Sequence, residues 1–177
     1  MSGKKFMKMA DNVVFSLEHK ALKFMTSGTD MKSLEPSAVI TEVVHDLSLA
    51  TSLDEVMRIV GQAARDLTGA DGATFVLRDE DKCYYADENA ISPLWKGSRF
   101  PLEACISGWC MLNRSTVLIR DIYQDSRIPH DAYRPTFVKS LCMVPIREAN
   151  PIGAIGNYWK TEHTPTNEEI KLLQMLA

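Results

Sequence analysis

The four cysteines could in principle bind a metal, form disulfides or act as nucleophiles, but they follow no metal-binding or disulfide pattern. Cys83, Cys105, Cys110 and Cys142 form no Cys-x-x-Cys pair and repeat no spacing. Cys105 and Cys110 are five residues apart, which in a helix would turn them about 140° from each other. They could not share an ion, so we expect no zinc site. We interpret the cysteines as small buried hydrophobes in a reducing compartment.

One cysteine stands apart because of its position before an expected helix. Cys105 precedes the apolar run that begins at Ile106. A helix N-terminus stabilises a thiolate and lowers the pKa of the thiol. Cys105 is therefore the cysteine that we select as a candidate site residue.

A second group of polar residues lies between positions 121 and 130. Asp121, Asp125 and Arg127 could contact a ligand, but short loops also use Asp to cap their own backbone amides and Arg to pair with it. We favour the loop interpretation for all three, and keep Asp121 as a candidate contact. His130 is either an exposed loop histidine or a second ligand contact.

Length and charge narrow the class of protein. The chain has 177 residues, near the size of one domain of about 150 residues. Its formal net charge is −3 and it has no basic block, so we expect no nucleic-acid partner. No apolar stretch is long enough for a membrane span, and no signal peptide is recognisable. We expect a cytoplasmic, folded domain.

The helices that must position these residues are predicted from apolar periodicity and capping signals. One helical stripe covers residues 4–25, and a second helix should begin near Pro36. Ser52 and Glu55 make a capping box for a third helix, which Gly69 should end.

The centre of the chain alternates like strands, and its end is helical again. We predict strands over 73–78, 82–86, 116–120, 140–147 and 152–159, and short helices over 106–112 and 132–137. Thr166 and Glu169 open a last helix. Its apolar stripe is still running at Ala177, which favours a piece of a longer protein.

Four motifs, in this order and spacing, resemble the GAF domains of bacterial two-component signalling proteins of the sensor histidine kinase type. The motifs are Ile106-Ser107-Gly108-Trp109, Asp121-Ile122 with Asp125 and Arg127, Ser140 to Ile146, and Pro151-Ile152-Gly153-Ala154-Ile155-Gly156. We accordingly expect a helical extension or linker over 1–35 and a GAF domain over 36–177, whose last helix leads towards an output domain.

The resemblance implies an α+β fold with a central antiparallel sheet of about six strands. Helices would cover one face, and a lid over a small-molecule pocket would cover the other. The residues of the lid region that we expect to contact the ligand are Trp95, Phe100, Cys105, Trp109, Asp121, Tyr123, His130, Tyr133 and Phe137. Phe75, Tyr84 and Trp159 could line the floor only if the strand pleat turned them that way.

The motifs that similar domains use for known ligands or reactions are incomplete in this chain. Asp81-Lys82-Cys83-Tyr84 resembles the Asp-x-Cys-Phe motif of some cyanobacterial photoreceptors, but it lies in a predicted hairpin. Covalent bilin attachment usually needs a Cys-His pair, which is missing, and cyclic-nucleotide binding needs an Asn-Lys signature, which is also missing. The GAF-like methionine sulfoxide reductases place a catalytic cysteine before the penultimate strand, but no cysteine lies between Met111 and Leu141. We expect no bilin, haem or zinc, and no enzyme activity.

We therefore predict a sensory module that binds an unidentified small molecule and relays the signal to a histidine kinase or other two-component output domain. The terminal helical stripes suggest a homodimer. The alternative is a GAF-fold interaction module that dimerises and binds no ligand. These two functions differ in whether the lid aromatics surround a ligand site or close on one another.

Overall fold

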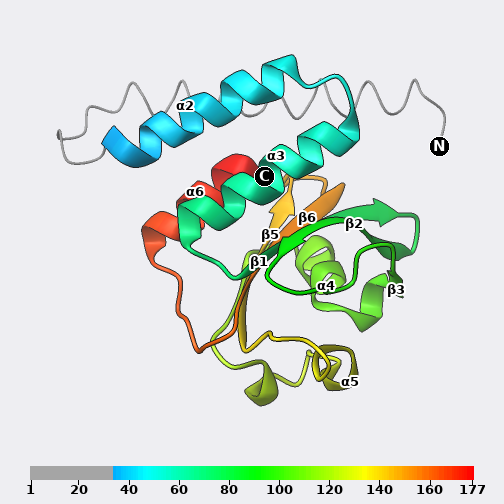
Figure 1. Cartoon of the computed structure of the whole chain (residues 1–177). Helices are drawn as coiled ribbons and strands as arrows, with labels where there is room; N and C mark the ends of the chain where they lie inside the picture. The colour runs from blue at the N-terminus through cyan, green and yellow to red at the C-terminus, as the bar shows by residue number, and fades with distance from the viewer. Residues whose placement is uncertain (1–33) are drawn as a thin grey trace.

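The computed structural model describes residues 34–177 (Figure 1). The helix predicted over 4–25, like most of the predicted 1–35 extension, lies outside these residues. The elements are α2 (Leu34–Leu49), α3 (Leu53–Thr68), β1 (Gly72–Asp79), β2 (Lys82–Ala90), β3 (Arg99–Pro101), η1 (Leu102–Ala104), α4 (Ile106–Asn113), β4 (Val117–Ile119), η2 (Ile122–Gln124), α5 (His130–Tyr133), β5 (Ser140–Ile146), β6 (Gly153–Trp159) and α6 (Asn167–Leu176).

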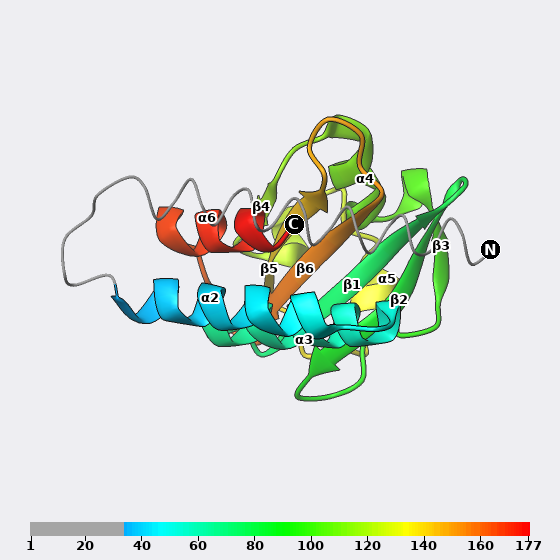
Figure 2. The ribbon, with the colours of Figure 1, turned by 90° about the horizontal axis from the view of Figure 1, so that it is seen from above.

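All six strands join one antiparallel sheet in the order β3-β2-β1-β6-β5-β4. The helices α3 and α6 lie on one face of this sheet, with α2 over α3, whereas α4 and α5 lie on the opposite side (Figures 1 and 2). The predicted α+β architecture of six strands with helices on one face is confirmed.

The helix face owes its stability to the amphipathic pattern of α3. Val56, Val60 and Ala64 are at most 1% exposed and pack towards the sheet. Ser52 caps the helix by accepting the Glu55 N–H at 3.2 Å. The Glu55 carboxylate in turn accepts from Thr51 N and Oγ1, just before the cap. Gly69 ends the helix with φ 61°.

The last helix buries its apolar stripe within the chain. Leu172, Leu173 and Leu176 are at most 6% exposed and belong to the same core as α3. The predicted capping box is complete, since Thr166 and Glu169 each bind the other's backbone N–H. Burial of this stripe needs no second copy of the chain.

The pleat of β5 and β6 divides the apolar residues between two cores. Cys142 and Val144 belong to the core under the helices, whereas Leu141 and Met143 belong to the core on the opposite face. We call the latter the lid core. It includes the side chains of β1, β2, β5 and β6 that face α4, and the apolar residues of α4 and of the segments that cover it.

Three boundaries differ from the sequence-based prediction. The strand β2 runs to Ala90 rather than 86, and Arg99–Pro101, predicted to be irregular, forms the edge strand β3. The polar residues near the end of β2 hid its strand character; among them, the Glu88 carboxylate accepts backbone N–H groups of the next segment. The short helix predicted over 132–137 is found at His130–Tyr133.

Among the described residues, no helix combines the length and the apolar character that a bilayer crossing requires.

Gly108 supplies the first testable prediction. A Cβ at this position would overlap the backbone carbonyl of Leu102, so α4 can only pack on η1 with glycine here. We expect Gly108→Ala to lower the free energy of unfolding by about 2 kcal/mol, measured by urea denaturation. Gly61→Ala is the matched control, since its Cβ would meet only Asn89 Cβ at 3.8 Å. It should be neutral or stabilising by up to about 1 kcal/mol. Equal losses in both variants would contradict the packing.

Candidate functional site

Trp95 is the centre of an aromatic cluster in the lid core. Its ring centroid lies 4.7 Å from that of Tyr133 and 5.5 Å from those of Tyr85 and Tyr158, all with edge geometry. Its indole Nε1 donates to the carbonyl of Ala132 at 3.0 Å. Trp95 is 8% exposed, so these contacts are largely dry. The cluster therefore joins the floor of the sheet to the segment around α5.

The backbone on either side of Trp95 is fixed by one carboxylate. Glu88 accepts the N–H groups of Leu94, Trp95 and Lys96 at 3.1, 2.9 and 2.8 Å. Hydrogen bonds to a charged acceptor are stronger than neutral ones. The end of β2 thus holds the indole in place above the sheet.

The lid core also contains a short polar chain. Tyr85 Oη lies 3.1 Å from Ser107 Oγ, which lies 3.3 Å from Cys105 Sγ. Nearby, Tyr158 Oη lies 2.9 Å from Thr74 Oγ1. Burial raises the pKa of both tyrosines above the usual value, so both keep their protons. These hydroxyls are the groups that could orient a polar ligand in an otherwise apolar site.

The two thiols on this face have opposite acid–base character. A hydrogen bond from Cys83, helped by Ser107 and the first backbone amides of α4, lowers the pKa of Cys105 to about 6. The same contact, with burial, raises the pKa of Cys83. The direction for Cys105 agrees with the sequence-based expectation, but the largest cause is Cys83 rather than the helix. Burial raises the pKa of both Cys110 and Cys142 to about 12.

The polar residues of the 121–130 segment bond mainly to the segment itself and its base. Asp121 accepts the N–H of Tyr123 at 2.9 Å and pairs with Lys139 Nζ at 2.9 Å. His130 Nε2 lies 3.0 Å from the carbonyl oxygen of Ile122. These partners are those expected of loop architecture.

A second ion pair stabilises the same loop. Asp125 binds the backbone N–H, Nε and Nη2 of Arg127 at 3.0, 2.9 and 2.6 Å. The guanidinium of Arg127 also lies 4.5 Å from the ring centroid of Trp109. The pair therefore anchors the loop to α4.

The structure brings together some of the nine predicted site residues. Trp95, Tyr133 and Cys105 are buried in the lid core, and Phe100 packs edge-on against Tyr85 at 5.5 Å. Trp109 and Phe137 are half-buried at its border. Asp121 lies before η2, His130 is the first residue of α5, and Tyr123 is 45% exposed. A ligand contact by any of the nine stays a prediction.

The sequence analysis did not identify three polar residues that face the lid core, two on the sheet and one on α4. Tyr85, Tyr158 and Ser107 face the lid core, whereas Phe75 and Trp159, which we considered for the floor, pack under the helices. Alternation along β2 and β6 could have grouped Cys83 with Tyr85. It could not say which of two neighbouring tyrosines faces the lid, because that depends on register.

An open cleft of about 670 Å³ lies elsewhere, between α3 and the end of β2. Its lining is dominated by charged side chains, among them Asp54, Arg58, Asp87 and Lys96. It is wide and polar, and it shares Glu88 with the clamp on the Trp95 backbone. It therefore lacks the apolar enclosure that small-molecule sites usually have.

Comparison with protein-family models identifies the family of this chain. The family model for the GAF domain matches residues 50–177. The chain belongs to the GAF family. The match includes α3, the whole sheet, the lid core and α6. No match was found among curated proteins.

Solved GAF structures share the fold at low sequence identity. The GAF domain of an Acinetobacter phosphoenolpyruvate-protein phosphotransferase has a TM-score of 0.70 and 15% identity, covering 84% of this chain and 89% of that one. Free methionine-R-sulfoxide reductase from Neisseria meningitidis, in complex with its substrate, gives 0.66 and 16%, covering 85% and 90%. The chromophore-binding domain of Stigmatella aurantiaca phytochrome P1 gives 0.64 and 17%, covering 84% and 60%.

The Asp121–Lys139 pair predicts a specific pH dependence. The hydrogen bond from Lys139 lowers the pKa of Asp121 in the folded state. The ionised Asp121 therefore stabilises the fold above its unfolded-state pKa of about 3.9. This stabilisation is lost as the pH falls through the lower pKa that Asp121 has in the folded state. Asp121→Asn keeps the cap on Tyr123 and removes the charge. We expect wild type to be more stable at pH 7 and this difference to vanish at low pH, measured as urea midpoints. A difference that persists unchanged to pH ~2 would contradict this cause.

Proposed function

We propose that this GAF domain is a cytoplasmic sensory module that binds a small molecule in the lid core. It would relay the signal through α6 to an output domain of the same protein, such as a histidine kinase, and perform no catalysis itself. Family membership supports the general role, and the fold is shared with a phytochrome chromophore-binding domain and with a reductase described in complex with its substrate.

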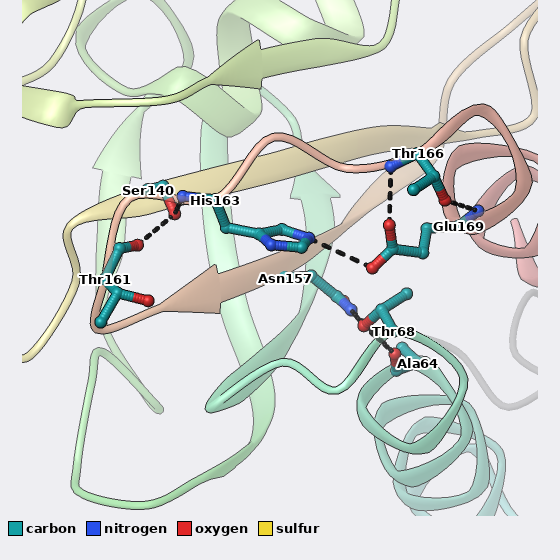
Figure 3. Close-up of polar contacts among 8 residues, drawn as sticks. All are labelled: Ala64, Thr68, Ser140, Asn157, Thr161, His163, Thr166 and Glu169. Atoms are coloured by element: carbon teal, nitrogen blue, oxygen red, sulfur yellow. Dashed lines mark hydrogen bonds and ion pairs between the residues drawn. The ribbon is translucent and has the colours of Figure 1, made fainter.

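The observation that carries the proposal is a shared attachment point for the lid and α6. Ile122 N donates to the carbonyl of Lys139 at 2.9 Å, and Lys139 N donates to that of Trp159 at 2.8 Å. The next residue, Ser140, donates to Thr161 O at 2.8 Å and accepts from His163 N at 3.1 Å (Figure 3). The base of the lid and the segment leading to α6 are thus fixed to the same end of β5 and β6.

From this point the contacts continue to the helix. The centroid of the His163 ring lies 4.3 Å from that of Trp159, with the two rings tilted by 31°. The His163 Nε2 lies 3.1 Å from Glu169 Oε1 (Figure 3). The other Glu169 oxygen accepts the N–H of Thr166, the N-cap of α6. A displacement at the lid base would therefore reach the first turn of α6 through adjoining hydrogen bonds.

The mechanism is a shift between two populations of lid conformations. In the closed form Trp95 fills the space among Tyr85, Tyr133 and Tyr158. A ligand would have to replace some of these ring contacts and would stabilise a form in which the lid has moved. It can shift the equilibrium only by the difference in its affinity for the two forms.

The closed aromatic cluster also supports the alternative function, an interaction module without ligand. In that case the cluster would be a permanent core and the surface of the domain would bind a partner. A homodimer through terminal helices stays a prediction. The α6 leucines that suggested it are buried within the chain, so a dimer would need a different surface.

Native mass spectrometry separates the two functions. The protein is incubated with the small-molecule fraction of a cell extract and compared with the same sample denatured, with an absorption spectrum alongside. We expect extra mass that is lost on denaturation, because a bound small molecule is held without a covalent bond. A bare mass in both samples would favour the interaction module, and extra mass that persists with visible absorption would show a covalent pigment.

Two neighbouring tyrosines provide a matched pair of variants for this measurement. Tyr85 faces the lid core and binds Ser107, whereas Tyr84 packs towards the helix side beneath the guanidinium of Arg99. Tyr85→Phe should weaken ligand affinity about fivefold by removing one hydrogen bond of about 1 kcal/mol, and so lower occupancy at sub-saturating ligand. Tyr84→Phe should leave occupancy unchanged. Equal effects would place the bound molecule outside the lid core.

A further inference from the structure

Two thiols from different elements meet in the lid core. Cys83, in β2, is fully buried, and Cys105, the N-cap of α4, is 7% exposed. Cys83 pairs with Phe100 of β3, and the neighbouring Lys82 pairs with Pro101. In its protonated form, Cys105 Sγ donates to the carbonyl of that same Pro101 at 3.4 Å. The turn η1 therefore returns the chain so that Cys105 lies over β2.

Ser107 locates the second thiol relative to β2 independently. Tyr85 is two residues after Cys83, so the two side chains lie on the same face of the strand. Tyr85 Oη contacts Ser107 Oγ, and Ser107 Oγ contacts Cys105 Sγ at 3.3 Å. Both cysteines belong to the lid core, and the pKa of each thiol is shifted by the other.

The two sulfurs differ in the way that a two-step thiol oxidation requires. The lowered pKa of Cys105, about 6, makes it largely a thiolate at neutral pH. The raised pKa of Cys83 keeps that residue a thiol. A thiolate is the form that reacts with peroxides, and a neighbouring thiol resolves the product.

We propose that Cys83 and Cys105 form a dithiol that hydrogen peroxide or an organic hydroperoxide oxidises reversibly to a disulfide. The Cys105 thiolate attacks the terminal peroxide oxygen, the O–O bond breaks, and the leaving hydroxide or alkoxide takes a proton. The sulfur of Cys83 then attacks the Cys105 sulfenic acid, its S–O bond breaks, and water leaves with the Cys83 proton. Two thiols lose two electrons and two protons, and the peroxide is reduced. No bound ligand is needed, so this reaction goes beyond the proposed function.

The disulfide would change the contacts under the lid. An S–S bond of about 2.05 Å draws the sulfurs closer than a thiol hydrogen bond does. Cys105 would then turn from Ser107, and Ser107 would lose one of its two side-chain contacts. Tyr85, the other partner of Ser107, is in edge contact with Trp95. Oxidation would therefore act on the aromatic cluster that closes the lid core.

Peptide mapping of the wild-type chain tests the proposal directly. The full chain is treated with hydrogen peroxide at neutral pH, free thiols are alkylated, and the digest is analysed by mass spectrometry. We expect loss of two hydrogens from the intact protein and one cross-linked peptide pair containing Cys83 and Cys105, both reversed by a dithiol reductant. Oxidation of Cys105 to sulfinic acid without a cross-link would overturn the proposal. So would a lack of reaction under conditions that oxidise free cysteine.

Variants and pH provide the controls. Cys83→Ser keeps a hydrogen-bond donor beside Cys105 but cannot form a disulfide, so it should stop at the Cys105 sulfenic acid, which dimedone traps. Cys110→Ala with Cys142→Ala should form the cross-link at the wild-type rate. In wild type the initial rate should reach half its maximum near pH 6, the pKa of Cys105. A rate that continues to rise through about pH 8.5, as for an ordinary thiol, would contradict the proposed nucleophile.

Discussion

The structure depends on the pairing of β5 with β6, two central strands that are buried on both faces. Every residue of both strands is buried, and alternate side chains serve opposite cores. A shift by one residue would exchange the two sets, so the register from Ser140–Trp159 to Ile146–Gly153 is fixed by packing on both sides. The lid core and the helix core are thereby held against one shared, stiff layer. If side chains move in one core, either that core repacks locally or β5 and β6 shift.

Polar contacts at one end of this layer provide a route to the helices. Asn157 of β6 donates to Ala64 O and Thr68 Oγ1 of α3, although its Oδ1 has no hydrogen-bond partner among the described residues (Figure 3). Leaving a buried acceptor unpaired costs about 1–3 kcal/mol. The amide therefore fixes β6 to α3 at a cost, while Ser140, His163 and Glu169 connect the neighbouring strand end to α6. The strand ends below the lid core are joined here to α3 and α6.

Local signals predicted the elements well, and the pleat less well. Capping residues at Ser52 and Thr166 and the apolar alternation of residues 140–159 located α3, α6, β5 and β6, because each signal acts within a few residues. Alternation groups Cys83 with Tyr85, but it does not say which face of β2 is turned towards the lid, because that depends on the pairing of β2 with β1. The contact of Cys83 with Cys105 was equally hidden, since it depends on β3, which has only three residues and no strand signature. Long-range pairing decided these features.

We infer that the lid and α6 are coupled through the contacts of Ser140. Hydrogen exchange measured by mass spectrometry on Ser140→Ala tests it, because this change removes the bonds to Thr161 O and His163 N. Ser115→Ala is the control, since Ser115 is exposed and its hydroxyl only contacts Thr116 O at 3.4 Å. We expect Ser140→Ala to speed amide exchange about fivefold in both 122–138 and 164–176, because a lost hydrogen bond is worth about 1 kcal/mol. Ser115→Ala should change the exchange rate in neither segment. Faster exchange in 164–176 with an unchanged lid would contradict the coupling.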